Sequence, residues 1–241
     1  MKSTNSSYDF NESLKRIDEI INASNDSFEE PENFPSRDKL TYTNGFYVNC
    51  TSLFIDIRNS SSLPENHTRP VLAKIYRAYI SETVAIINSK DTCREVNIHG
   101  DCVWGVFETP KKIDVDQIFN VAYSCASIID IINCKLRKKG FAEITVGIGV
   151  DYGRALMIKS GFSGSGINEV VWMGDVVNQA SKLCHFGNKS ALDCEIMVSK
   201  VIYDNLNNHN KSLLSWNSIR DCYHGNIVNM DMDKWKNDNC K

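Results

Sequence analysis

The chain has 241 residues, of which 42% are hydrophobic and 24% are charged, and these proportions are ordinary for a globular protein. Its 27 lysines and arginines against 30 aspartates and glutamates give a formal net charge of -3, which provides no basic field for a nucleic-acid backbone. No apolar run approaches the roughly 20 residues of a membrane span, and the first residues lack the apolar core of a signal peptide. We therefore expect a cytoplasmic protein that neither binds nucleic acid nor inserts into a membrane.

The first 38 residues are predicted to form an N-terminal helix and linker, separate from a domain over residues 39–241. Apolar residues recur at helical spacing within Phe10–Ile21, with Asp9 or Asn11 as the cap. The polar, acidic stretch that follows contains two prolines, which is typical of a linker. We expect the helix to pack on the domain or against a second copy of the chain.

Strands and helices alternate through the domain. In chain order the predicted elements are a strand over 46–58, a helix over 70–87, short strands over 95–97 and 102–107, a helix over 114–138, a strand over 144–150 and its hairpin partner over 154–159. Asp151-Tyr-Gly153 is the expected turn of that hairpin. This order is that of a split βαβ, or ferredoxin-like, unit. It predicts an α+β domain with helices on one face of a mainly antiparallel sheet.

Three further features are assigned structural roles. Residues 161–166, Gly-Phe-Ser-Gly-Ser-Gly, lack the Lys-Ser/Thr pair of a phosphate-binding P-loop and are predicted to form a hairpin or dimer-arm loop. Residues 217–235 are predicted to form a closing hairpin. The nine cysteines include no Cys-x-x-Cys pair and no cluster with histidine at zinc-ligand spacing, so we expect reduced cysteines that act as small core residues.

Asp56 and Asp101 each lie where an apolar strand meets a break. A carboxylate that is buried and unpaired in such a strand costs several kcal/mol. Brought together on neighbouring strands, the two would form an oxygen-ligand site for a pair of divalent cations. This pair therefore predicts phosphoryl chemistry on a nucleotide. The alternative is that each aspartate only ends a strand.

Four motifs occur in order between residues 45 and 200. They are Phe54-Ile-Asp-Ile57, Gly100-Asp101, the segment 144–153 and the segment 172–183. Together they resemble the class III nucleotidyl cyclases, in which they would be the two metal motifs, the central strand with its turn, and the helix that carries a catalytic Asn and Arg. The sequences of residues 69–76 and 96–107 resemble more closely those of the pyrimidine cyclases of bacterial Pycsar antiphage systems.

The resemblance implies a lyase that converts a nucleoside triphosphate to a 3′,5′-cyclic nucleotide and pyrophosphate. It implies a homodimer with two composite active sites, each using the metal aspartates of one subunit and the Asn-bearing helix of the other. Two Mn²⁺ or Mg²⁺ ions would be held in each site by Asp56, Asp101 and the carbonyl of Ile57. The product would be a second messenger in antiphage defence, recognised by a separate effector protein.

Asn178 and Lys182 match the catalytic pair of the family. They stand at i and i+4, on one face of one helix. In the family the Asn orients the ribose and an Arg stabilises the pentavalent phosphorus. Here the second residue is lysine, which supplies a point charge but no bidentate fork. The alternative is an ordinary solvated helix face.

The turn Asn59-Ser60-Ser61 leads into the first long helix. Its backbone N–H groups and the positive end of the helix are expected to bind the β- and γ-phosphates, with Arg58 close enough in sequence to assist. The alternative is a turn without a ligand.

Asn97, Val171 and Trp172 are the expected base-pocket residues. Cyclases that make cyclic AMP carry Lys at the position of Asn97 and Asp at that of Val171, so adenine would lose its polar contacts here. Trp172 would narrow the pocket to fit a single-ring base. The alternative is that Asn97 ends a strand and Trp172 belongs to the core.

The function that we expect is a uridylate cyclase that uses UTP. A cytidylate cyclase that uses CTP is the first alternative, because uracil and cytosine differ by exchange of a donor for an acceptor and amide orientation is not readable from sequence. A purine cyclase with unusual base contacts is another. An alternative of a different class is a catalytically inactive, nucleotide-binding domain that signals through its N-terminal helix. The presence of both metal-motif aspartates argues against an inactive domain, whereas lysine in place of the family's arginine at position 182 argues for one.

Overall fold

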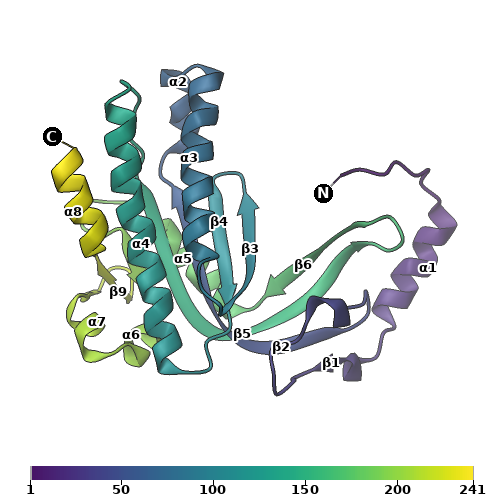
Figure 1. Cartoon of the computed structure of the whole chain (residues 1–241). Coiled ribbons are helices and arrows are strands. Elements are labelled where there is room, and N and C mark those ends of the chain that lie inside the picture. Colours follow the sequence, from purple (N-terminus) through teal and green to yellow (C-terminus); the bar gives the residue numbers. More distant parts are fainter. Residues whose placement is uncertain (1, 241) are drawn as a thin grey trace. The chain divides into compact units, whose positions relative to one another are not determined.

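The computed structural model describes residues 2–240, which divide into two compact units (Figure 1). Unit 1 joins the N-terminal segment up to Asn49 to the segment Arg154–Asp175. Unit 2 joins Cys50–Gly153 to the segment from Val176 onward. Two strands, β2 (Gly45–Ile57) and β5 (Val146–Phe162), pass from one unit into the other. The predicted boundary at residue 38 is not a limit of either unit.

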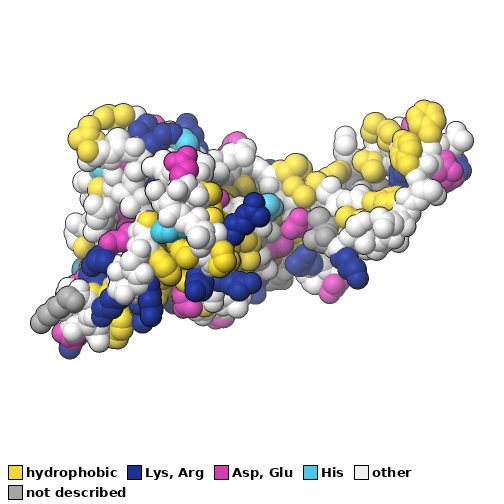
Figure 2. Space-filling model, turned by 90° about the horizontal axis from the view of Figure 1, so that it is seen from above, with side chains coloured by type: hydrophobic (Ala, Val, Ile, Leu, Met, Phe, Trp, Pro, Cys, Tyr) yellow, Lys and Arg dark blue, Asp and Glu magenta, His cyan; other side chains and the backbone are white. Residues whose placement is uncertain are grey.

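Unit 1 begins with helix α1 (Phe10–Ile21), which has the predicted bounds. Asp9 caps it by accepting hydrogen bonds from the N–H groups of Asn11 and Glu12, at 2.9 and 3.1 Å. No residue of α1 is buried, and apolar side chains gather on this exposed N-terminal segment in Figure 2. The predicted linker contains a short strand, β1 (Phe28–Glu29), which pairs in parallel with the start of β2.

The prediction of a hairpin turn at Asp151–Gly153 is wrong. Strand β5 continues through it without a break and pairs antiparallel with β6 (Ile167–Met173). A tight hairpin needs residues at positive φ, and Gly153 does not adopt one. Gly161, Gly164 and Gly166 do adopt positive φ, so the loop over 161–166 closes the hairpin, as predicted for that segment.

Unit 2 contains most of the remaining elements. They are α2 (Leu63–Asn66), α3 (Arg69–Ile87), β3 (Cys93–His99), β4 (Cys102–Phe107), α4 (Lys112–Arg137), α5 (Asp175–Phe186), β7 (Ile196–Val198), α6 (Lys200–Asn205), α7 (Asn208–Ser212), β8 (Ser215–Asn217), β9 (Cys222–Gly225) and α8 (Met230–Asn239). The strand order of the sheet is β3-β4-β2-β5-β7-β9-β8, with β1 paired to β2 and β6 to β5. The fold is therefore α+β with a mixed sheet, in which β5 and β7 run parallel.

Helices cover both faces of the sheet in unit 2, whereas one covered face was expected. Leu53 and Ile55 of β2 belong to the main core, which also contains the buried faces of α3 and α4. These two helices lie side by side in Figure 1. Phe54 projects to the opposite face and packs with Ala180 and Cys184 of α5, because successive side chains of a strand alternate between faces.

Among residues 2–240, α4 is the one helix long and apolar enough to cross a membrane. However, 61% of its most apolar stretch is buried inside the protein, and the core helix of a soluble domain has the same character. Its buried residues include Ile118 and Phe119, which contribute to the main core.

A disulfide joins Cys134 of α4 to Cys240, with 5.7 Å between their Cα atoms. The expectation that the cysteines are reduced is wrong for this pair. Helix α8, which contains Trp235, brings Cys240 to α4, so the predicted closing hairpin ends at Gly225 of β9. The other seven cysteines are free, and four of them are buried, as predicted for small core residues: Cys50, Cys125, Cys184 and Cys222.

Candidate active site

The carboxyl groups of Asp56 and Asp101 lie together in unit 2. Strands β2 and β4 pair antiparallel with Ile55 opposite Val103, so Asp56 lies beside the turn that carries Asp101. Gly100 makes that turn possible, because its φ of 64° is unstrained in glycine. The two carboxyl groups are close enough for the charge of Asp101 to raise the pKa of Asp56. The sequence prediction that these two aspartates converge therefore agrees with the structure.

The electrostatics of the pair suit a divalent cation. Burial raises the pKa of Asp56, the neighbouring charge of Asp101 raises it further, and Arg58 acts in the opposite direction. A bound cation would reverse the effect of Asp101. Two carboxylates leave most coordination positions to water and phosphate oxygens, which is how Mg²⁺ is usually held in nucleotide sites. In the described part of the chain, no group of three or more His, Cys, Asp or Glu side chains could hold a metal ion.

Arg58 is turned toward the protein. Its Nη2 donates to the Oδ2 and the carbonyl oxygen of Asp56, at 3.1 and 3.2 Å, and its Nη1 donates to the carbonyl oxygen of His185 at 3.0 Å. Only 11% of the side chain is exposed. These contacts do not favour the predicted role of Arg58 in binding a triphosphate, which stays a prediction.

The turn after β2 combines a left-handed residue with a short helical turn. Asn59 adopts a left-handed conformation with φ of 53°, and Ser60–Ser62 form one turn of 3₁₀-helix. Asn59 and Ser61 are exposed. The structure thus places Asn59, Ser60 and Ser61, three of the four predicted triphosphate-binding residues, in one turn that directly follows the strand carrying Asp56.

Tyr76 is a neighbour of the aspartates that sequence reasoning missed. Burial, and then the charges of Asp101 and Asp56, raise the pKa of its hydroxyl. It stands three residues before Tyr79, whose buried hydroxyl donates to the carbonyl oxygen of Ile55 at 3.1 Å. The i, i+3 spacing of two tyrosines on the helix after the turn was the available signal.

Asn178 and Lys182 lie on the exposed face of α5. The opposite face, with Ala180 and Cys184, is buried against Phe54. The Nζ of Lys182 lies 5.9 Å from the ring centre of Phe186 on the same helix. The predicted pair therefore shares one surface, on a helix whose other side is fixed to the strand that carries Asp56.

Asn97 lies in an aromatic row on β3, β4 and β2. It pairs across the strands with Trp104, which in turn pairs with Phe54 and stacks on it with ring centres 4.9 Å apart. Trp104 Nε1 donates to His99 Nδ1 at 3.3 Å. Asn97 is buried, and its Nδ2 has no hydrogen-bond partner among the described residues, which is costly unless a ligand supplies one.

Val171 and Trp172 belong to β6 in unit 1. Trp172 is buried and contacts Phe34 with ring centres 5.8 Å apart, which agrees with the core alternative for this residue. Val171 is 37% exposed.

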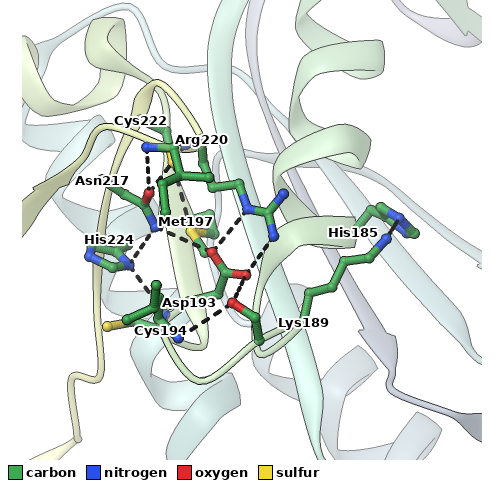
Figure 3. Close-up of polar contacts among 12 residues, drawn as sticks. His185, Lys189, Asp193, Cys194, Met197, Asn217, Arg220, Cys222 and His224 are labelled. Carbon is green, nitrogen blue, oxygen red and sulfur yellow. Dashed lines mark hydrogen bonds and ion pairs between the residues drawn. The ribbon is translucent and has the colours of Figure 1, made fainter.

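A polar cluster holds the loop before β7 to the β8–β9 hairpin (Figure 3). Asp193 accepts hydrogen bonds from Nε and Nη2 of Arg220, at 3.0 and 2.8 Å, and from Ser190 and Asn217. The hydrogen bond from Arg220, together with those from Ser190 and Asn217, lowers the pKa of Asp193 to about 2. The guanidinium of Arg220 lies 4.5 Å from the ring centre of Phe186, so the cluster also contacts the end of α5.

Comparisons with known proteins give one consistent result. The family described as adenylate and guanylate cyclase catalytic domain matches residues 43–230. A protein named uridylate cyclase from Gulbenkiania mobilis is 42% identical over 99% of this chain and 100% of its own length. A protein named uridylate cyclase from Treponema porcinum is 39% identical over 89% of this chain and 74% of its own length. The adenylyl cyclase CyaB from P. aeruginosa has a similar fold, with a TM-score of 0.61 and 19% identity over 71% of this chain and 85% of that one.

Proposed function

The chain belongs to the adenylate and guanylate cyclase catalytic domain family, the class III nucleotidyl cyclases, and on that basis we propose that it cyclises UTP to 3′,5′-cyclic UMP and pyrophosphate. The observation that carries the proposal is the meeting of the Asp56 and Asp101 carboxyl groups at the end of β2. The names of relatives at 42% and 39% identity support a pyrimidine substrate. The likeness of residues 69–76 and 96–107 to Pycsar cyclases supports a cytoplasmic role in antiphage defence, with a separate effector that binds the product.

The reaction forms a bond between the ribose 3′-oxygen and the α-phosphorus, and it breaks the bond from that phosphorus to pyrophosphate. Two divalent ions, when bound, lower the pKa of the 3′-hydroxyl and neutralise charge on the triphosphate. Asp56 and Asp101 would hold both ions, with the carbonyl of Ile57 as a further ligand. The turn Asn59–Ser61 would donate backbone N–H groups to the terminal phosphates. The proton of the 3′-hydroxyl passes to solvent.

Asn178 would orient the ribose, and Lys182 would stabilise the negative charge that develops on the phosphorus oxygens. Both side chains are exposed on the helix face that points away from Phe54. In a homodimer they would serve the site whose metal aspartates belong to the other subunit. The single ammonium of Lys182 requires closer placement than the fork of an arginine.

Base selection would depend on Asn97, whose amide is buried without a partner for its Nδ2. A carbonyl oxygen of a pyrimidine would satisfy that donor, and uracil presents one at the position where cytosine presents an amino group. CTP is the second candidate, because the amide can be turned to accept instead of donate.

The experiment that tests the proposal is incubation of the pure protein with each of the four nucleoside triphosphates and Mn²⁺, with products identified by mass. Cyclic UMP as the main product would support the proposal. Cyclic CMP would select the second candidate, and a cyclic purine nucleotide would contradict the assignment of the base pocket. No cyclic product under any condition, with nucleotide binding retained, would indicate the inactive signalling domain.

A further inference from the structure

Arg58 carries a charge into a nearly closed space between strand β2 and helix α5. Only 11% of its side chain is exposed. On one side its Nη2 donates to both the carboxylate and the carbonyl oxygen of Asp56. The carboxylate that would bind a metal ion is therefore held through one of its two oxygens, which leaves the other for a ligand bond.

On its other side Arg58 reaches the C-terminal end of α5. Its Nη1 donates to the carbonyl oxygen of His185, in the last turn of the helix, at 3.0 Å. The carbonyl groups of a last turn have no partner within the helix and carry partial negative charge, so a guanidinium there is favourable. The thiol of Cys184, which donates to the carbonyl oxygen of Gly147 at 3.1 Å, lies close enough to Arg58 for the positive charge to lower its pKa, although burial raises that pKa overall.

The guanidinium of Arg58 lies against Gly147, where the backbone leaves no room for a larger residue. A Cβ atom added to Gly147 would lie 3.2 Å from Cζ of Arg58 and only 2.3 Å from the carbonyl oxygen of Cys184, so glycine is required there. The Nε of Arg58 is buried and has no hydrogen-bond partner within residues 2–240. Burying a charge with one donor unpaired costs free energy, and stability alone does not account for that cost.

We propose that Arg58 is a positioning residue. By bonding to both the carboxylate of Asp56 and the end of helix α5, it fixes the position of that carboxylate relative to the helix. The proposal rests on the proposed function for the roles of Asp56 as a metal ligand and of α5 as the carrier of Asn178 and Lys182. Arginine suits this task because its planar fork donates in two directions at once, whereas the ammonium of lysine is a single point.

The test compares Arg58→Met and Arg58→Lys with the wild type, with Arg137→Met as the control. Arg137 is an exposed arginine that pairs with Glu143, so its replacement removes an arginine without touching the site. The first measurement is the affinity for Mn²⁺ without nucleotide, from the electron paramagnetic resonance signal of the free ion. The second is hydrogen exchange of the backbone amides in the last turn of α5.

We expect Arg58→Met to bind Mn²⁺ about 10- to 100-fold more weakly, the usual effect of removing a residue that orients a metal ligand. The amides at the end of α5 should exchange faster, while exchange elsewhere and the control stay as in the wild type. Arg58→Lys should keep part of the Mn²⁺ affinity and show the faster exchange. The KM for nucleotide at saturating Mn²⁺ should change little.

Unchanged Mn²⁺ affinity and unchanged exchange in both variants would overturn the proposal. If only the KM for nucleotide rose, Arg58 would be a triphosphate ligand instead. Tighter Mn²⁺ binding by Arg58→Met would also contradict the positioning role, because it would mean that the guanidinium of the wild type competes with the ion. If Arg58→Met does not fold, Arg58→Lys decides alone, and wild-type behaviour in both measurements refutes the idea. If the wild type binds no Mn²⁺ in the absence of nucleotide, the exchange experiment decides on Arg58, and the product assay decides separately on the proposed function.

Discussion

Asp56 and Asp101 stand 45 residues apart in the sequence, yet their carboxyl groups are close enough for the charge of Asp101 to raise the pKa of Asp56. Replacing either with Asn keeps the volume and removes the charge that would hold a divalent ion. We expect Asp56→Asn and Asp101→Asn each to lower kcat by at least about 100-fold with Mn²⁺, or about 3 kcal/mol of barrier. Steady-state turnover measures this. Asp18→Asn, at an exposed position of α1, should match the wild type, and near-normal turnover of both site variants would disprove the two-ion assignment.

A complementation experiment tests whether the active sites are shared between subunits. Asp56→Asn and Lys182→Ala should each be nearly inactive alone, but after mixing and subunit exchange half of the dimers contain one of each. If the residues act across the interface, one of the two sites in each mixed dimer is intact, so about a quarter of wild-type activity should return. If both residues act within one subunit, mixing restores nothing. Lys200→Ala, at an exposed position of α6, mixed with Asp56→Asn should keep half of the wild-type activity whether or not subunits exchange, so it controls for the effect of mixing itself.

Glu195 predicts a pH dependence of stability. Its half-buried carboxyl has a pKa raised to about 7, first by burial and then by the charge of Asp130. The folded state therefore binds the proton more tightly than the unfolded chain, whose pKa is near 4.5, and stability is lost as pH rises between these values. We expect Glu195→Gln to be more stable than the wild type by about 2 kcal/mol at pH 8 and equal to it at pH 4.

Urea unfolding at the two pH values measures this difference. Glu82→Gln, at an exposed position of α3, should show no such dependence. Equal stability of Glu195→Gln and the wild type at pH 8 would show that the carboxyl is hydrated in solution.

The Cys134–Cys240 disulfide closes a loop of 106 residues. Cross-linking a loop of that length is worth up to about 5 kcal/mol through the entropy of the unfolded chain. We expect Cys240→Ser to lower Tm by about 10 °C under oxidising conditions. The same variant should match the wild type when both are reduced. A calorimetric scan with and without dithiothreitol tests this, and a difference that persists under reduction would assign the loss to packing of α8 instead.

Elements with a clear hydrophobic period were predictable from the sequence. Helices α1 and α3 and strand β4 have bounds within one residue of those expected. The turn at Asp151–Gly153 was misplaced because glycine permits a turn without requiring one, and only the backbone shows that Gly153 stays extended. The disulfide was missed because nothing local marks a pair 106 residues apart.

The candidate site was predictable in part. A buried, unpaired aspartate next to an apolar strand is costly, and that cost, together with the order of the four motifs, indicated Asp56 and Asp101. The direction of a long side chain is set by its three-dimensional neighbours, so the sequence did not show that Arg58 turns toward His185. Nor did it show that Tyr76 approaches the aspartates, since its helix had to be placed on the sheet first.

Strand β5 is unbroken, and it pairs with β7 along its first part and with β6 along its last part. Ile148 stands opposite Ile196 on β7, and Leu156 stands opposite Met173 on β6, along a single strand of 17 residues. Inserting one residue between Val150 and Ala155 would reverse the inward and outward alternation of everything beyond it, whereas inserting two would preserve it. The strand should therefore tolerate insertions of an even number of residues better than insertions of an odd number. Natural variation in its length should come in steps of two residues.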